Sequence, residues 1–230
     1  MSQRVGAIAG LSGAILMSVL LIIVALAYRG TANEPYSPFN HFVSELGHTG
    51  DSELWPGFSA AVILGGLSFV AAMYAFALPF TGWARWTLTI LGAITGICGL
   101  LVGVFPMDTA NTGHTYSALG FFLSALITVG MFSAVIALSK QTAYPRWLVI
   151  PGLLPVISLI IFLATLIERV SVVGAEGSLQ VPAAQRAAVE LLATSEWAVI
   201  IFLNVWMIVT AVHVLSRNPV RMQAARPNPA

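Results

Sequence analysis

Charged residues are scarce in this chain. They make up 8% of its 230 residues, whereas hydrophobic residues make up 58% and the mean hydropathy is +0.89. Soluble globular domains carry about 25% charged residues. The composition therefore excludes an ordinary soluble domain and is typical of a polytopic membrane protein.

Lysine and cysteine are almost absent. Lys140 is the one lysine beside nine arginines, so no basic stretch can follow a nucleic-acid backbone, and we expect no nucleic-acid partner. Cys98 is the one cysteine, which excludes an intramolecular disulfide and a cysteine-rich metal site. Zinc-protease, phosphate-loop, dinucleotide and haem-attachment motifs are also missing from the sequence, so it indicates no cofactor beyond the metal alternative considered below.

Long apolar runs are what the chain does contain. Six of them are long enough to cross the hydrocarbon core of a bilayer, which is about 30 Å thick. They span residues 6–28, 57–78, 86–107, 115–139, 147–167 and 197–216, and the helix that contains the last run is predicted over residues 183–216. This helix exceeds what a span needs, so its first part, including Arg186, should project into water. We predict an all-α, six-helix transmembrane bundle that forms a single membrane domain over residues 1–230.

Basic residues in the short loops predict the orientation of this bundle. One side holds both termini and carries Arg4, Arg85, Lys140, Arg146, Arg217, Arg221 and Arg226. The other side carries Arg29, Arg169 and Arg186. This imbalance places both termini in the cytoplasm, and we expect a multi-pass protein of the cytoplasmic membrane with membrane lipids as partners.

Glycine and apolar residues recur at helical spacing in two places. In the third run, a glycine stripe predicts close helix packing, and the same stripe makes a homodimer an alternative. Its members are Gly92, Gly96, Gly99 and Gly103. In the outer loop, residues 29–56, the pattern predicts a short interfacial helix over residues 39–46 that lies on the membrane or folds back over the bundle. The apolar residues of that pattern are Phe39, Phe42, Val43 and Leu46.

Acids and histidines gather at the predicted outer face. Asp108 and His114 lie in a short polar turn between two membrane runs. Counted from the cytoplasmic ends, Asp108, Glu168 and Glu196 each fall about 20 residues along a span, so they reach a similar depth. Ionisable groups at that depth are costly unless they pair, face water or line a cavity. We therefore predict an outward-facing polar pocket, whose candidate members are Asp108, His114, Glu168, Glu196 and, from the outer loop, His41, Ser44 and Glu45.

Three kinds of chemistry fit these side chains, and a structural role competes with them. A divalent metal held by Asp108, His114, His41 or Glu168 would activate water against a lipid ester or phosphoester. Alternatively, Ser44 is a nucleophile and His114 is its base. In the third reading, the pocket binds a lipid headgroup or a small amphiphile without covalent chemistry. In the structural alternative, Asp108 caps the turn and His114 lies at the interface.

Several stretches also resemble a known family. They are Ser44-Glu45-Leu46-Gly47, the segment from Gly103 to Asp108, His114 at the start of the fourth run, and Glu196-Trp197. Together they resemble the bacterial and archaeal membrane proteins of domain-of-unknown-function family 998 over nearly the whole chain. The resemblance implies the six-helix fold and the importance of Ser44, Glu45, Asp108, His114 and Glu196, without a reaction. A more distant similarity to the Frag/DRAM/Sfk family, connected with lipid-anchor remodelling and lipid distribution, rests on the outer loop and His114.

The preferred hypothesis combines the pocket with lipid chemistry. We expect recognition, and with it hydrolysis, of a lipid headgroup or small amphiphile. Asp108 and His114 would form the acid/base or ligand pair, with Glu196 and Glu45 as supporting carboxylates. The alternative is a non-enzymatic lipid-binding or accessory protein or a small-solute transporter. Transport is less favoured because the ionisable groups gather at one face and not near the bilayer midplane.

Overall fold

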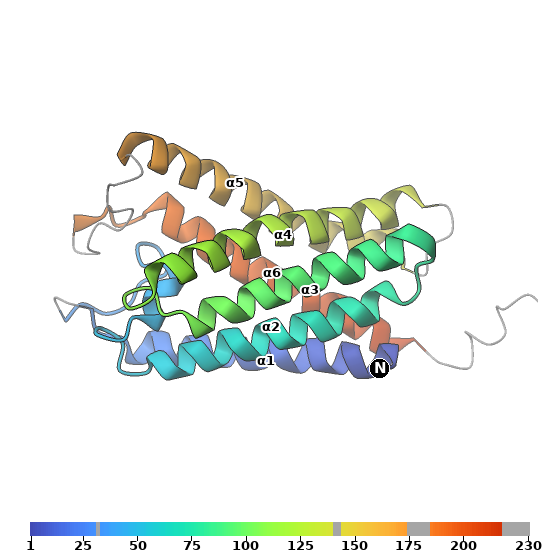
Figure 1. Cartoon of the computed structure of the whole chain (residues 1–230), viewed down its shortest axis with the longest axis horizontal. Coiled ribbons are helices and arrows are strands. Elements are labelled where there is room, and N and C mark those ends of the chain that lie inside the picture. The colour runs from blue at the N-terminus through green and yellow to red at the C-terminus, as the bar shows by residue number, and fades with distance from the viewer. Residues whose placement is uncertain (31–32, 140–143, 174–184, 218–230) are drawn as a thin grey trace, which may run out of the picture.

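The computed structural model describes residues 1–30, 33–139, 144–173 and 185–217. Within these residues, six long apolar helices run side by side as a bundle (Figure 1). They are α1 (Gln3–Ala27), α2 (Trp55–Ala77), α3 (Gly82–Val104), α4 (Asn111–Leu138), α5 (Val149–Val173) and α6 (Leu191–Ser216). Two short 3₁₀ helices, η1 (Val43–Gly47) and η2 (Arg146–Leu148), lie between them. The structure thus confirms the predicted all-α bundle of a multi-pass membrane protein.

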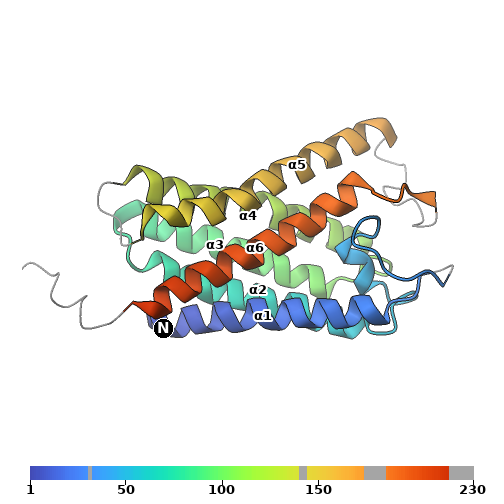
Figure 2. The same cartoon turned by 180° about the vertical axis from the view of Figure 1, so that it is seen from behind.

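The two ends of the bundle differ in content. The N-terminus and the end of α6 lie together at one end, which we call the terminal end (Figures 1 and 2). The opposite end, which we call the loop end, carries the segment between α1 and α2, the turn between α3 and α4, and the residues ahead of α6. All candidate site residues lie at or near the loop end.

Glycines set the close approach of α2 and α3. A Cβ atom added to Gly96 would lie 2.5 Å from the carbonyl oxygen of Gly66, and one added to Gly66 would clash with the carbonyl oxygen of Gly96. Gly92 and Gly103 also face α2. Helix backbones in lipid pack closely where side chains are missing. The predicted stripe therefore serves packing within the bundle, and the homodimer stays a prediction.

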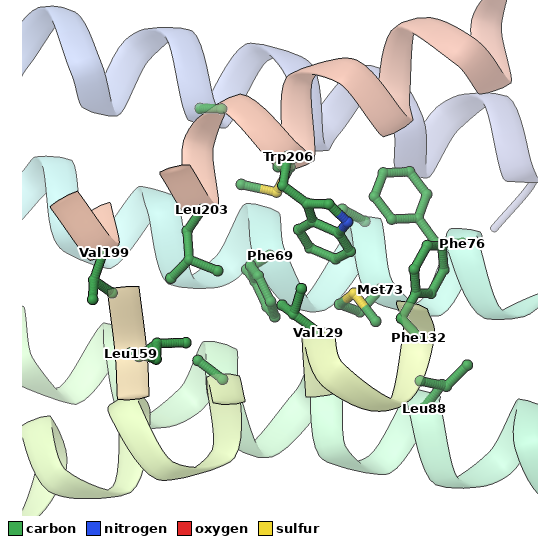
Figure 3. Close-up of a cluster of buried hydrophobic side chains, with 14 of the residues drawn as sticks. Phe69, Met73, Phe76, Leu88, Val129, Phe132, Leu159, Val199, Leu203 and Trp206 are labelled. Atoms are coloured by element: carbon green, nitrogen blue, oxygen red, sulfur yellow. The ribbon is translucent and has the colours of Figure 1, made fainter. Parts of the chain in front are cut away.

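Aromatic side chains fill the core toward the terminal end (Figure 3). The ring of Trp206 from α6 is buried, with its centroid 5.4 Å from that of Phe132 on α4 and 6.2 Å from that of Phe76 on α2. The hydroxyl of Tyr144 donates to the carbonyl oxygen of Phe76 at 2.9 Å. These contacts join three helices, so the core fixes α6 against α2 and α4.

The last helix begins later than predicted. The sequence predicts a helix over residues 183–216, but α6 starts at Leu191, and the described residues ahead of it, 185–190, are not in an α-helix. The backbone N–H of Glu190 donates to the carbonyl oxygen of Phe39 at 2.7 Å. Tertiary contacts with the outer loop therefore replace the expected helical turns.

Residues 39–46 also differ from the predicted interfacial helix. A turn at residues 38–40 precedes η1, and η1 contacts α1, α2 and α6. Phe42, Val43 and Leu46 are buried, whereas Phe39 is exposed. The apolar pattern thus folds the segment back over the bundle, which is the second of the two predicted placements, and it does so through a 3₁₀ helix that begins at Val43.

The glycine contact makes a stability prediction. Gly96→Ala places a methyl group against the α2 backbone and should lower the free energy of unfolding by about 1–3 kcal/mol. Gly130→Ala on α4 is the matched control, since the nearest atom to its added Cβ is 3.9 Å away. Thermal unfolding in detergent measures both. Equal melting temperatures for the two variants would contradict the packing role.

Candidate functional site

A buried ion pair holds the loop end together. Arg186 Nη2 lies 2.6 Å from Glu45 Oε1, and Nη1 lies 2.9 Å from Oε2, with side chains 2% and 7% exposed. Nη1 also donates to the carbonyl oxygen of Asn40 at 2.7 Å, and the guanidinium carbon lies 4.9 Å from the ring centroid of Phe42. A planar guanidinium matches a carboxylate at two points. The pair therefore fixes η1 against the residues ahead of α6.

Glu196 of α6 also holds the start of η1 in place. Its Oε2 accepts the backbone N–H of Val43 at 2.7 Å, and the residue is buried. Two residues earlier, the Thr194 hydroxyl donates to the carbonyl oxygen of Phe39 at 3.0 Å. These bonds lay residues 39–43 along the start of α6. Ser44 follows Val43 directly and is thereby brought to the Glu196 side of the bundle.

His114 contributes from the first turn of α4. It is buried, and its Nδ1 lies 2.8 Å from the carbonyl oxygen of Phe105 at the end of α3. A carbonyl oxygen can only accept, so Nδ1 carries the proton. In the neutral ring, the lone pair is then at Nε2, where it can accept a hydrogen bond or act as a base.

Ser44, His114 and Glu196 lie where two cavities meet in the described part of the chain. The inner cavity, of about 80 Å³, lies between α1, α2, α3, α4 and α6, and the outer cavity, of about 520 Å³, lies between α4, α5 and α6. The three polar residues line both cavities, together with Ala118 and Phe122. We call them the polar trio. The outer cavity is otherwise mostly apolar, with walls that include Leu119, Phe162, Leu166, Ile167, Val170 and Leu192.

A family model described as a protein of unknown function (DUF998) matches residues 15–213, which include the polar trio and the Arg186–Glu45 pair. The chain belongs to the DUF998 family. The match confirms the resemblance that the motifs at Ser44 and Gly103 indicated. Curated proteins and solved structures gave no match. The more distant similarity to the Frag/DRAM/Sfk family is not shown and stays a prediction.

Asp108 has a different place in this DUF998 chain from the one predicted. Its Oδ2 accepts the backbone N–H of Thr49 at 2.9 Å and the Thr49 hydroxyl at 2.6 Å. Partial burial raises the pKa of Asp108, but the bonds from Thr49 outweigh it, so the pKa lies below its usual value. In the structure, Asp108 is directed to the loop and His114 to Phe105, and their role as an acid/base or ligand pair stays a prediction.

Other predicted members also lie apart from the trio. Among the described residues, those that line the two cavities do not include Glu45, Glu168 or His41. Glu45 is paired with Arg186, Glu168 is exposed on α5, and the Nε2 of buried His41 lies 3.9 Å from Glu34 Oε1. Counting residues along a helix predicts how deep a side chain lies in the membrane but not which way it points. Glu168 therefore lies at the expected depth but on a face of α5 that does not line the cavities.

The predicted metal set is not assembled in the described residues. No group of three or more His, Cys, Asp or Glu side chains there could hold a metal ion. The four predicted ligands are dispersed over the outer loop, the turn after α3, α4 and α5. They are Asp108, His114, His41 and Glu168. The geometry therefore gives the metal hypothesis no support, and the catalytic roles predicted for the other residues stay predictions.

The contact of Arg186 with Glu45 is not predicted from the sequence. The predicted long final helix placed Arg186 in water, whereas the structure buries its side chain between Glu45 and Phe42. A signal was available, because Arg186 is one of three basic residues among the many acids of the predicted outer side. An isolated charge in such surroundings is more stable when it is paired.

The ion pair makes the second stability prediction. Glu45→Gln leaves the buried Arg186 guanidinium without its counter-charge and should cost about 3–5 kcal/mol of folding free energy. Asp51→Asn is the control, because the partly exposed His48–Asp51 pair should be worth less than about 1 kcal/mol. Chemical unfolding in detergent checks both variants. A loss no larger for Glu45→Gln than for Asp51→Asn would show that the pair does not hold the loop end.

Proposed function

We propose that the protein binds a membrane amphiphile, with its polar group at the polar trio and its hydrocarbon chain in the outer cavity. The observation that carries this proposal is the convergence of Ser44, His114 and Glu196 from three separate segments on one boundary. The mostly apolar walls suit a hydrocarbon chain. The outer cavity, of about 520 Å³, also falls within the range of about 300–1,000 Å³ that is usual for ligand sites.

The side chains that line the two cavities favour one class of polar group. Glu196 supplies carboxyl oxygens, neutral His114 supplies an acceptor at Nε2, and Ser44 supplies a hydroxyl that donates or accepts. Among the described residues that line the two cavities, none is a lysine or an arginine. A phosphate would be buried there without a counter-charge, at a high cost in an apolar site. The ligand is therefore a neutral amphiphile that carries hydroxyl or amine donors.

Ester hydrolysis at the same place is a second candidate. The observation that favours it is the bond from His114 Nδ1 to Phe105, which leaves the neutral Nε2 free to take a proton. Nε2 would take the proton of the Ser44 hydroxyl as its oxygen attacks an ester carbonyl, and would return it to the departing alcohol. Water would then release the acyl group from Ser44. Asp108 has no part in this step.

We also propose that the protein lies in the cytoplasmic membrane with its loop end outward. The acidic residues that the structure describes lie toward the loop end, whereas Arg4, Arg85, Arg146 and Arg217 lie at the terminal end. This asymmetry supports the orientation that the loop charges predict. An accessory protein that only holds the amphiphile, or one that transfers it, is compatible with the same binding site.

The binding proposal is tested by what co-purifies with the protein. His114→Phe keeps an aromatic ring but removes both nitrogens, so retention of the bound amphiphile in native mass spectrometry should fall several-fold. Asp108→Asn is the control, and it should retain the ligand because Asp108 bonds to Thr49 outside the trio. Melting temperatures must show that both variants are folded. Equal retention in the wild type and in folded His114→Phe would contradict the proposal.

Ser44→Ala separates binding from hydrolysis. A binding protein should keep most of its ligand after this change, and the cellular lipid profile should stay the same. A hydrolase should keep the intact ester and lose the product that wild-type cells accumulate. An unchanged profile in cells that contain folded wild type or folded Ser44→Ala would rule out the hydrolytic candidate.

A further inference from the structure

We propose that the outer cavity opens sideways into the bilayer between α4 and α5, so that its ligand enters from a membrane leaflet and not from water. This inference rests on the proposed binding function and narrows it to an amphiphile that resides in the membrane. Three observations support it: the residues shared by the cavity and the lipid-facing surface, the course of α5, and the closed water-facing side.

The first observation concerns side chains that belong to both surfaces. Ile167 on α5 and Leu119 on α4 line the outer cavity, yet they are 69% and 39% exposed. Val170 on α5 also lines the outer cavity and is exposed. An exposed apolar side chain on a membrane-spanning helix faces hydrocarbon. At these residues, the cavity wall and the lipid-facing surface are therefore the same surface.

The course of α5 explains why this wall is incomplete. In both views, the half of α5 nearest the loop end leans away from α4 (Figures 1 and 2). The outer cavity lies in this region, since α4 and α5 each contribute several of its walls. Nearer the terminal end, Leu159 of α5 is fully buried. The helix is thus packed at one end and separated from α4 at the other, which leaves a side opening at the level of the trio.

The described part of the water-facing side is closed by contrast. Phe42 lines the outer cavity and is buried, and the Arg186 guanidinium stacks over its ring. Arg186 is held in turn by Glu45. Leu192 at the start of α6 is also buried and lines the same cavity. A ligand that came from water would have to displace this assembly, whereas one from the leaflet meets mostly apolar side chains.

Entry from the side can be tested by photolabelling in vesicles. The protein is placed in phosphatidylcholine vesicles that contain a trace of long-chain monoacylglycerol with a diazirine on its acyl chain. Phe122 is the reporter, because it is buried and lines both cavities. Labelling of Phe122 over time, read by mass spectrometry of the peptide, follows arrival of the probe in the cavity.

Two substitution pairs distinguish the side opening from a general effect of bulk. Ile167→Trp and Leu119→Trp enlarge residues at the opening and should slow labelling of Phe122 several-fold. Ile160→Trp and Leu123→Trp place the same residue at exposed positions of the same helices, 53% and 45% exposed, outside the cavity lining, and should leave the rate unchanged. Melting temperatures check that all four variants are folded.

The outcomes separate this inference from the binding proposal. Slower labelling with the two opening variants alone supports entry from the bilayer. Equal rates in all four variants, with Phe122 still labelled, would overturn entry from the side and leave binding intact. The same conclusion follows if a water-soluble hexanoyl probe labels Phe122 faster than the long-chain probe and is unaffected by Ile167→Trp. If Phe122 is never labelled in the wild type, both proposals fail.

Discussion

The bidentate contact between Arg186 and Glu45 is the interaction on which the loop end depends. Two charges are buried there, and each is stable only because the other neutralises it and fills its hydrogen-bonding positions. The contact joins residues that are far apart in the chain and holds η1 over the helices. Without it, the Val43 N–H would lose its fixed approach to Glu196, and Ser44 would have no defined place beside the cavities.

Burial of polar groups near lipid explains how the rest of the site is built. Glu196 accepts a hydrogen bond from the Val43 N–H, and His114 donates one to the carbonyl oxygen of Phe105. Each polar side chain thus has one atom hydrogen-bonded within the protein, and its other polar atom is available to the cavities. Glycines bring α2 and α3 together on one side, while α5 leans away on the other. The outcome is a tightly packed bundle with one region of open, mostly apolar space beside three polar groups.

The sequence predicts the long helices well because runs of apolar residues have few other stable solutions in a membrane. It also draws attention to His114 and Glu196, which are costly at their depth without a cavity or partner. In the structure both are buried and line the two cavities, and their roles stay predictions. The sequence fails for Asp108 and Glu168, because spacing along a helix does not show which way a side chain points after a turn. Arg186 was missed for a related reason: its partner Glu45 lies in a separate loop, and long-range pairing leaves no local pattern.

On our proposal, the polar trio and the outer cavity together hold one amphiphile. The most direct measurement is an electron cryo-microscopy map of the protein in lipid nanodiscs that contain the co-purified amphiphile. We expect a continuous chain-shaped density between α4, α5 and α6, with its polar end within hydrogen-bonding distance of Ser44, His114 or Glu196. Resolved side chains around an empty outer cavity, or a ligand whose polar end lies away from all three residues, would contradict it.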